Sequence, residues 1–572
     1  MLIVFKSEMN EVDEKADEKL NQKYNEKVDF DDILELVGGY GRFQRRFNYI
    51  FNVLFLALVC MVISNLFLAL SVPKHWCYVP GRENTNFTIE QWKEITIPRN
   101  QSGENLKNDF ASCKMYRNFS LDQNEIVDCQ FGYDFDTTWY TETFAMKHKW
   151  VCGNEINVAN AFFFQKLGDI FGGLIFGPIG DQYGRQLIFY LTFTILFVSR
   201  LAMLFTSSST TLFMITCFLS GSATFGVFQS SLVIALEICH RKVHAYMAMC
   251  QCVGWAIGFC IMPFIMWYLK EWKSFILMTT IPSGIFFFSR RFMIESPRWL
   301  FNKGKRKKCL MAMRKIGKIN GVDVGDELES MVLIGNELKP EKVYGAMSIF
   351  SHWRFAKNSI ILIMGWAIEN VVYYILTMNI INLGGNPFMN FFWQGLAEIP
   401  GNVLGKIAAD KIGRKWSAFI AYVGLAFGTL PILFTVYDKN YEYITLIFGV
   451  CLKFLLTFAF YAINLQALET FPTAVRQSGT SVGGVTANIF GLLGPYIVYL
   501  GTTTNASIPY LISFTLAIVY AFALLFLPET LGEKLPDTLN DAHVFGKDQP
   551  FFYFPKRMHS MVPNKENTQK IS

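Results

Sequence analysis

The chain has 572 residues, of which 52% are hydrophobic and only 17% are charged. Soluble domains carry about a quarter of charged residues, so this composition excludes a set of ordinary soluble domains. The net charge of +6 does not indicate a nucleic-acid partner, because the basic residues lie in loops between apolar runs.

Residues 1–47 are expected to form a cytoplasmic N-terminal segment without a cleaved signal, because no long apolar run precedes Asn48. Six apolar runs follow, each about as long as a helix that crosses a hydrocarbon core of roughly 30 Å. They are Asn48–Leu70, Asn157–Pro178, Leu187–Thr206, Leu212–Leu236, Tyr246–Tyr268 and Phe275–Ile294. Backbone groups in lipid must be satisfied within the segment, so each run predicts a helix.

A basic stretch separates these runs from six more, which are Ile360–Leu383, Phe388–Ala408, Ser417–Val436, Tyr443–Asn464, Gly479–Leu500 and Tyr510–Leu527. The predicted domains are an N-terminal six-helix bundle over 48–294, a cytoplasmic central loop over 295–357, a C-terminal six-helix bundle over 358–528 and a cytoplasmic tail over 529–572. The fold class is therefore an all-α membrane protein with twelve transmembrane helices.

Lysine and arginine set the expected orientation, because they gather in cytoplasmic loops. One set of loops, which includes the central loop, is rich in lysine and arginine, whereas the short opposite loops 207–211 and 501–507 hold none. Both termini are therefore predicted to be cytoplasmic in a multi-pass protein of the plasma membrane.

The first outer loop, 73–150, is predicted to be extracellular. Its cysteines Cys77, Cys113 and Cys129, together with Cys152 just past its end, predict two disulfides, and three pairings are open. Asn86, Asn100 and Asn118 each begin an N-x-S/T sequence, so we expect glycosylation there.

Charged motifs recur in order in the two halves. D-Q-Y-G-R at Asp181–Arg185 returns as D-K-I-G-R at Asp410–Arg414, and the acids Glu237 and Glu295 return as Glu469 and Glu529. The near-constant offset predicts two duplicated six-helix units in parallel orientation.

These motifs are interpreted as a cytoplasmic gate that holds the two halves together in one transport state. A glycine between the aspartate and the arginine permits a tight turn with positive φ, and charges at helix ends can form ion pairs in one transport state and release them in another. The predicted gating residues are Asp181, Arg185, Glu237, Arg241, Glu295, Arg298, Asp410, Arg414, Glu469, Arg476 and Glu529.

The repeated D-x-x-G-R resembles the major facilitator superfamily. E-S-P-R-W-L at Glu295–Leu300, E-T-F-P-T-A-V-R at Glu469–Arg476, P-E-T-L-G-E-K-L-P-D-T at Pro528–Thr538 and F-D-D-I-L-E-L-V-G-G-Y-G-R-F-Q at Phe30–Gln44 narrow the resemblance to the organic ion carrier family. The resemblance covers roughly Phe30 to Thr538. One departure is His244, which stands where an arginine would match Arg476; Arg241 is the expected substitute.

Charged residues inside spans are costly and are candidates for function. Here they are Lys166, Asp169, Glu369, Glu398 and Lys453. Lys166 and Asp169 lie three residues apart and are expected to neutralise each other. In the resembled family, span eleven commonly carries an aspartate in cation carriers and an arginine in anion carriers; this chain has Asn488 there, and Phe225 where a span-four lysine is often found.

Glu369 is interpreted as an unpaired carboxylate that would bind an ammonium group together with nearby aromatic rings. The predicted substrate-binding residues are Glu369, Tyr373, Tyr374, Asn488, Phe225, Phe228, Trp255, Trp393, Gln394 and Glu398. The expected function is alternating-access transport of small organic cations or zwitterions within the lipid bilayer. The alternatives are an organic anion carrier and a non-transporting receptor or scaffold. No nucleophile elbow, phosphate loop or metal-spaced cluster is apparent, so neither an enzyme nor a cofactor is expected.

Overall fold

The computed structural model describes residues 30–99, 110–117, 125–240, 243–322, 328–329, 331–332, 346–380, 383–437, 439–533, 536, 539–547 and 549–554. The chain divides into two compact units, 1–69 with 164–342 and 70–163 with 343–572. The second unit thus includes the first-loop segment that the sequence grouped with the N-terminal bundle, and the predicted domain boundaries remain a prediction.

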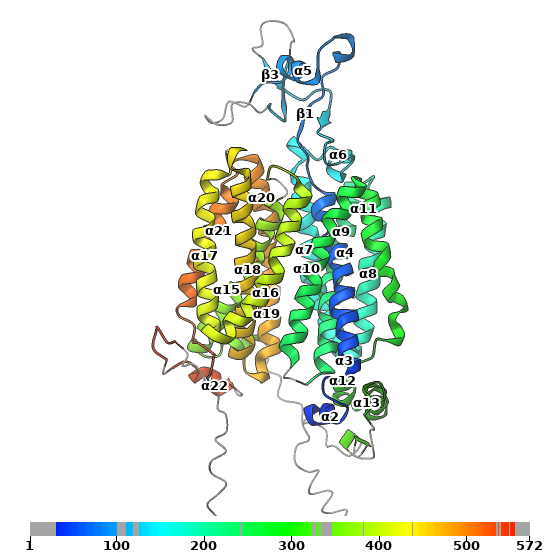
Figure 1. Cartoon of the computed structure of the whole chain (residues 1–572), viewed down its shortest axis with the longest axis vertical. Helices are drawn as coiled ribbons and strands as arrows, with labels where there is room; N and C mark the ends of the chain where they lie inside the picture. The colour runs from blue at the N-terminus through cyan, green and yellow to red at the C-terminus, as the bar shows by residue number, and fades with distance from the viewer. Residues whose placement is uncertain are drawn as a thin grey trace, which may run out of the picture. The chain divides into compact units, whose positions relative to one another are not determined.

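The first unit consists of helices (Figure 1). It contains α2 (Phe30–Leu36), α3 (Arg42–Phe47), η1 (Asn48–Leu54), α4 (Phe55–Ala69), most of α7 (Ile156–Tyr183), α8 (Arg185–Thr206), α9 (Thr210–Glu237), α10 (His244–Leu269), α11 (Trp272–Thr280), η5 (Ile281–Arg291), α12 (Pro297–Asn302) and α13 (Arg306–Asn320). Small residues let α7 and α9 approach closely, since a Cβ on Gly172 would lie 1.7 Å from the carbonyl oxygen of Ser222.

The second unit repeats this helical arrangement. Its helices are η6 (Ala346–Phe350), α15 (Trp353–Asn379), α16 (Pro387–Ile412), α17 (Arg414–Thr435), η8 (Lys439–Tyr441), α18 (Glu442–Thr470), α19 (Thr473–Gly491), α20 (Leu493–Thr503), α21 (Ile508–Leu524) and α22 (Leu539–Val544). Asn386 starts α16, because its side chain accepts hydrogen bonds from the backbone N–H groups of Phe388 and Met389 at 2.9 and 3.3 Å.

The second unit also contains a small lobe of short strands and helices, drawn at the top of Figure 1. It contains β1 (His75–Cys77), η2 (Arg82–Asn84), α5 (Ile89–Thr96), β2 (Lys114–Tyr116), β3 (Ile126–Asp128), β4 (Tyr133–Phe135), α6 (Phe144–His148) and η3 (Cys152–Asn154). Strand β1 pairs antiparallel with β4, and β2 pairs antiparallel with β3.

Within the described ranges, eight helices are long and apolar enough to cross a membrane. The described residues contain four further spans: α7 and α16, which carry charged side chains, the broken pair α11–η5 and the shorter α21. With α4 extending η1, and α20 extending α19, each unit has six spans, which confirms the predicted fold class.

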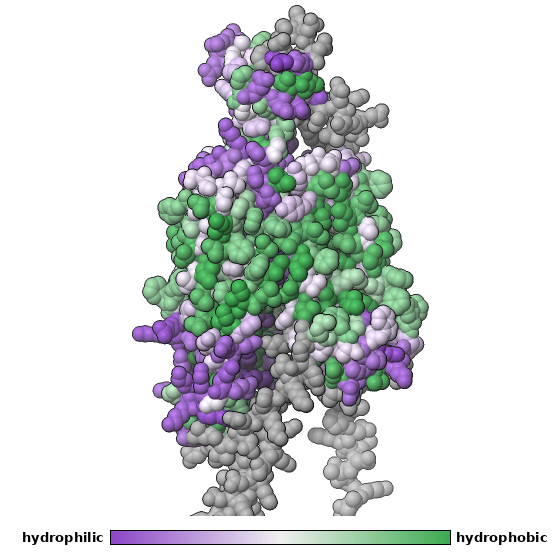
Figure 2. Space-filling view, turned by 180° about the vertical axis from the view of Figure 1, so that it is seen from behind, coloured by the Kyte–Doolittle hydropathy of each residue, from purple (hydrophilic) through white to green (hydrophobic). Residues whose placement is uncertain are grey.

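The outer faces of the helices support this reading. Large apolar side chains such as Phe205, Phe288 and Phe434 are at least 80% exposed. Apolar side chains cover the middle of the helices, and hydrophilic side chains gather toward their ends (Figure 2). Such apolar surface is what a helix presents to lipid.

The C-terminal segment 549–554 packs onto the start of α17 and the end of α21. The side chain of Gln549 exchanges two 2.9 Å hydrogen bonds with the backbone of Glu529. Trp416 donates a 2.8 Å hydrogen bond to the carbonyl oxygen of Tyr553, and its ring stacks on Phe554 at 4.4 Å. The tail is therefore part of the second unit.

Candidate functional site

The repeated motifs form two charge clusters, one in each unit. The first charge cluster is Asp181, Arg185, Glu237 and Glu295, and the second is Asp410, Arg414, Glu469 and Glu529. Arg185 lies 2.7 Å from Asp181 and 3.6 Å from Glu237. Arg414 lies 3.8 Å from Asp410 and 2.9 Å from Glu469. The same arrangement of four residues therefore occurs twice.

In each cluster, the last acid caps the helix that follows the glycine. Glu295 accepts a 2.9 Å hydrogen bond from the backbone N–H of Arg185, and Glu529 accepts a 2.9 Å hydrogen bond from that of Arg414. A carboxylate is favourable there because a helix N-terminus carries partial positive charge. Gly184 and Gly413 have φ of +124° and +111°, which confirms the predicted positive φ.

All of these ion pairs join residues within one unit, so a role in holding the two halves together stays a prediction. Arg298 does not join the first charge cluster by an ion pair but pairs with Asp31 of α2. Arg476 donates a 3.2 Å hydrogen bond from Nε to the carbonyl oxygen of Phe471. Arg241 lies outside the described residues, so its predicted pairing cannot be placed.

The exposure of the side chains in the two charge clusters predicts which substitutions lower the stability of the protein and which lower only uptake. The side chains of Asp181 and Asp410 are 50% and 52% exposed, whereas those of Glu237 and Glu469 are only 19% and 15% exposed. Exposed i,i+4 pairs contribute about 0.3–0.5 kcal/mol. We expect Asp181→Asn and Asp410→Asn to leave the melting temperature nearly unchanged while lowering uptake, and Glu469→Gln to lower both. Full uptake by the double Asn variant would contradict a gating role.

A second set of charges lies in the interior of the second unit and is called the interior cluster here: Glu369, Tyr373, Glu398 and Lys453. The fully buried ammonium of Lys453 lies 3.2 Å from Glu398 and donates a 2.8 Å hydrogen bond to Thr377. It also lies 3.1 Å from the centre of the Tyr373 ring, and the Tyr373 hydroxyl donates a 3.0 Å hydrogen bond to Glu398. This network joins α15, α16 and α18.

The absence of an ion-pair partner for Glu369 stays a prediction, because the ion pair of Lys453 is with Glu398. Glu369 is 7% exposed and interacts electrostatically with Lys453, which comes from a helix far away in the sequence. Its Oε2 atom accepts no hydrogen bond from the described residues. The interior cluster therefore has two carboxylates and one ammonium group, so Glu369 is incompletely compensated rather than isolated.

Next to this cluster, partly exposed polar and aromatic residues form a stripe along α15, α18 and α19. Trp366 donates a 3.0 Å hydrogen bond to Asn464, and Asn370 donates one of 3.5 Å to Asn488. Tyr373 continues the same face of α15, one turn after Asn370. The polar stripe is Trp366, Asn370, Tyr373, Asn464 and Asn488, and it brings the predicted Tyr373 and Asn488 together with two asparagines that the sequence analysis did not single out.

The remaining predicted binding residues have varied surroundings. Gln394 is buried and donates a 2.9 Å hydrogen bond to the carbonyl oxygen of Leu376, so it joins α16 to α15. Trp393 is 43% exposed beside Phe392, and Tyr374 lies against Tyr373 at 6.5 Å. In the first unit, Phe228 packs edge-on against Trp255 at 5.8 Å, and Phe225 is 36% exposed.

Three further buried charged residues, Lys166, Asp169 and Arg200, lie among the described residues of the first unit. Lys166 and Asp169 form the expected ion pair, at 3.3 Å. Arg200 of α8 was missed by the sequence analysis because it lies near the end of an apolar run. It is fully buried and donates a 2.9 Å hydrogen bond to the carbonyl oxygen of Ile63. This bond holds α8 against α4.

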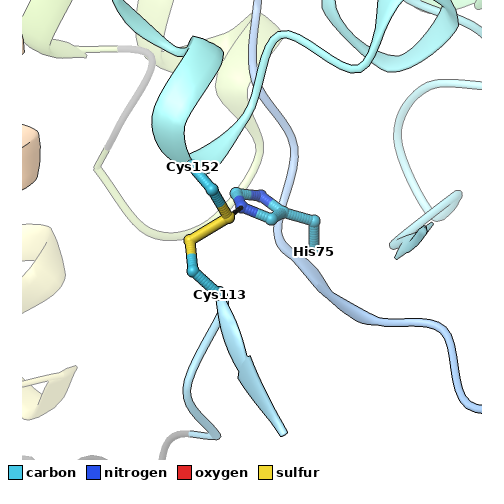
Figure 3. A group of neighbouring side chains, drawn as sticks. All are labelled: His75, Cys113 and Cys152. Atoms are coloured by element: carbon cyan, nitrogen blue, oxygen red, sulfur yellow. Dashed lines mark hydrogen bonds between the residues drawn. A yellow bond between two sulfur atoms is a disulfide. The ribbon is translucent and has the colours of Figure 1, made fainter. Parts of the chain in front are cut away.

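The disulfides of the first-loop lobe are Cys77–Cys129 and Cys113–Cys152. The Sγ atoms of Cys113 and Cys152 and a ring nitrogen of His75 all lie within 4.8 Å of one another. Figure 3 shows the three side chains. They do not offer a metal site as they stand, because both sulfurs are joined in a disulfide and are not thiolates. Asn86 is exposed, whereas Asn100 and Asn118 lie outside the described residues; glycosylation remains a prediction.

With the fold and the site described, comparison with known proteins identifies the class. The model of the family "Sugar (and other) transporter" matches residues 126–539. The chain belongs to this family, so it is a membrane transporter of the major facilitator superfamily and not an enzyme. Among solved structures, the inward open conformation of the xylose transporter XylE from E. coli has a TM-score of 0.55 and 16% identity, covering 71% of this chain and 92% of that one.

The curated relatives are more specific, and they confirm the resemblance to organic ion carriers. Organic cation/carnitine transporter 2 of Homo sapiens is 26% identical over 532 residues, which cover 90% of this chain and 93% of the relative. Organic cation transporter 1 of Caenorhabditis elegans is 26% identical, and the match covers 91% of this chain and 89% of the relative. The Beta-alanine transporter of Drosophila melanogaster is 26% identical, and the match covers 90% of this chain and 89% of the relative.

Proposed function

We propose that this protein carries small organic cations or zwitterions across the plasma membrane by alternating access, with both termini in the cytoplasm. The observation that supports the substrate class is the surplus carboxylate of the interior cluster. Lys453 pairs with Glu398, and its charge also acts on the buried Glu369, so one negative charge is left over when all three groups are ionised. An ammonium group on a solute would compensate that charge.

The polar stripe supports the route by which such a solute would reach the cluster. Tyr373 is partly exposed, while its hydroxyl bonds Glu398 and its ring covers Lys453. A cation that contacts the Tyr373 ring would therefore act on the buried charges behind it. The amides of Asn370 and Asn488 add hydrogen-bonding groups without charge, so the carboxylate of a zwitterion would not be repelled there.

The names of the relatives agree with this class of solute. Two of the three relatives described above are called transporters of organic cations, and one of these names also includes carnitine. The third is called a transporter of beta-alanine, a zwitterion that carries both an ammonium and a carboxylate group. All of these compounds share a cationic nitrogen, which is the group that a surplus carboxylate would select.

Uptake into cells tests the proposal. We expect saturable uptake of a radiolabelled quaternary ammonium compound or of beta-alanine, and little uptake of a dicarboxylate. Preference for the dicarboxylate would favour the organic anion reading. Absence of uptake for a broad panel, with normal protein at the surface, would favour a receptor or scaffold.

Glu369→Gln is expected to lower uptake of the cationic solute at least tenfold, because it removes the surplus negative charge. A tenfold change corresponds to about 1.4 kcal/mol, well within the Coulomb energy of charges a few ångströms apart. Surface biotinylation should show an unchanged amount of protein, since Glu398 and Lys453 still pair. Asp169→Asn, which disturbs a buried ion pair of the first unit, is the matched control. Unchanged uptake by Glu369→Gln would assign this residue a structural role.

A further inference from the structure

The disulfide Cys113–Cys152 has an imidazole beside one of its sulfurs (Figure 3). Cys113 directly precedes β2, Cys152 begins η3 just before α7, and His75 begins β1. The Nε2 atom of His75 lies 3.8 Å from the Sγ atom of Cys152. This disulfide therefore ties the hairpin β2–β3 to the start of α7, with His75 at the α7 side.

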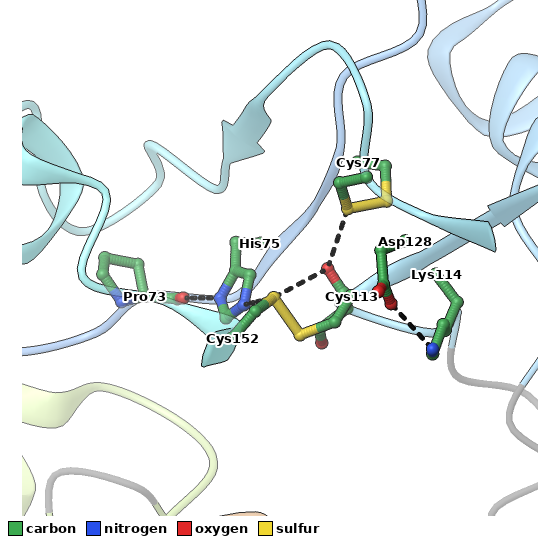
Figure 4. The surroundings of a disulfide bond; sticks show 9 residues. Pro73, His75, Cys77, Cys113, Lys114, Asp128 and Cys152 are labelled. Atoms are coloured by element: carbon green, nitrogen blue, oxygen red, sulfur yellow. Dashed lines mark hydrogen bonds and ion pairs between the residues drawn. A yellow bond between two sulfur atoms is a disulfide. The ribbon is translucent and has the colours of Figure 1, made fainter. Parts of the chain in front are cut away.

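The orientation of the His75 ring follows from its other contacts. Its Nδ1 atom lies 3.1 Å from the carbonyl oxygen of Pro73, which can only accept, so Nδ1 carries the proton (Figure 4). Nε2 is then unprotonated, and its lone pair faces the Sγ atom of Cys152. Partial burial lowers the pKa of His75, which keeps the ring neutral. The rings of Tyr133 and Phe135, at 6.3 and 5.9 Å, hold the imidazole in this position.

The second disulfide provides a contrast within the same lobe. Cys77 is 2% exposed and packs with Val79 and Met115, and Cys129 approaches the carbonyl oxygen of Ser112 at 3.9 Å. Among the described residues, neither of these sulfurs has a hydrogen-bonding contact with a histidine. Cys152 approaches the same carbonyl oxygen at 3.8 Å, so the two disulfides share one neighbourhood and differ in the presence of His75.

We propose that Cys113–Cys152 is a thiol-exchange site, at which a small external thiol forms a mixed disulfide with Cys113 while His75 assists the departure of Cys152. The thiol RSH loses its proton to water, and the resulting thiolate attacks Sγ of Cys113 from the side opposite Cys152. A bond forms between the external sulfur and Cys113, the bond between Cys113 and Cys152 breaks, and its electron pair leaves on Cys152. The proton that the thiol released reaches Nε2 of His75 through water, and the resulting imidazolium pairs with the thiolate of Cys152 or protonates it.

Two physical reasons assign these roles to the two cysteines. A disulfide opens faster when the departing sulfur is the better leaving group, and a neighbouring imidazolium stabilises a thiolate. His75 lies beside Cys152, so Cys152 is the sulfur that leaves and Cys113 is the sulfur that is attacked. The hydrogen bond from Nδ1 to the carbonyl oxygen of Pro73 fixes the orientation of the His75 ring, so that Nε2 points at Cys152. Metal-bound histidines are often oriented in the same way, by a hydrogen bond from the second ring nitrogen.

The test uses the full-length protein, purified in detergent and incubated with reduced glutathione. Newly freed cysteines are alkylated at successive times and identified by mass spectrometry, together with glutathione adducts. We expect Cys113–Cys152 to open at least tenfold faster than Cys77–Cys129, and the adduct to form on Cys113. His75→Gln should slow the opening of Cys113–Cys152 about tenfold and leave Cys77–Cys129 unchanged. His148→Gln, in α6 of the same lobe, is the matched control and should change neither rate.

The comparison between the two disulfides needs no variant, so the proposal remains testable even if His75→Gln fails to fold. Equal opening rates for the two disulfides in the unmodified protein would overturn it. So would an adduct on Cys152, or a His75→Gln protein that exchanges as fast as the unmodified one. None of these outcomes depends on uptake, so they are independent of the proposed transport function.

Discussion

Replacement of Lys453 by methionine is expected to lower the melting temperature of the purified protein strongly and to abolish uptake. Lys453 is fully buried and lies 3.2 Å from the equally buried Glu398. Removing one partner of a buried ion pair typically costs about 3–5 kcal/mol, because the other charge is left in a medium of low dielectric constant. Here two carboxylates, Glu369 and Glu398, would lose the same cation.

A second substitution distinguishes loss of charge balance from loss of packing. In Lys453→Met/Glu398→Gln, the amide oxygen of residue 398 can still accept the hydrogen bond from Tyr373, and no carboxylate remains there. We expect the double variant to recover most of the lost melting temperature without recovering uptake. A Lys453→Met protein as stable as the unmodified one, or a double variant less stable than Lys453→Met, would contradict the account of the interior cluster.

Gly413→Ala and Gly184→Ala are both expected to destabilise the protein by about 3 kcal/mol or more. The backbone at Gly413 has φ of +111° and ψ of 157°, a region essentially restricted to glycine and costing other residues about 1–3 kcal/mol. A Cβ on Gly413 would also lie 2.3 Å from Oε2 of Glu529, and one on Gly184 would lie 2.3 Å from Oε2 of Glu295. The methyl group would push away the carboxylate that caps the next helix.

Gly484 is the matched control for these substitutions. It lies in α19, has an ordinary φ, and a Cβ there would have no atom within 4 Å. Alanine is the better helix former by about 1 kcal/mol, so Gly484→Ala should keep or raise the melting temperature. Thermal unfolding of the purified proteins gives the melting temperatures of Gly413→Ala, Gly184→Ala and Gly484→Ala. Equal melting temperatures for Gly413→Ala and Gly484→Ala would mean that the second charge cluster does not need its glycine.

The sequence predicted the spans and the charge clusters because both leave local signals. Runs of about 20 apolar residues identify the helices, and the repeated motifs place Arg185 and Arg414 at equivalent turns. The partners of Lys453 could not be predicted in this way. Lys453 and Glu398 are 55 residues apart on different helices, and helices that are apolar all round do not reveal which face meets a neighbour.

Other contacts were hidden for similar reasons. Four cysteines allow three pairings, and only the folded chain shows that Cys77 pairs with Cys129. The pairing of Arg298 with Asp31 joins segments 267 residues apart. The tail residues Gln549 and Tyr553 belong to no recognised motif, and their contacts with Glu529 and Trp416 leave no local signal in the sequence. Long-range contacts of this kind need the folded chain.

The way in which each unit is completed has a consequence for biosynthesis. In the first unit, Asn320 at the end of α13 bonds the carbonyl oxygen of Val37 at 2.7 Å and the backbone N–H of Phe43 at 2.8 Å, so the contacts that close this unit are available once the ribosome has passed the central loop. The second unit holds Glu529 through Gln549, which follows the last span α21, so its closing contacts form only after all of its spans have been made. The two repeats, alike in their charged turns, are therefore completed at different points of synthesis.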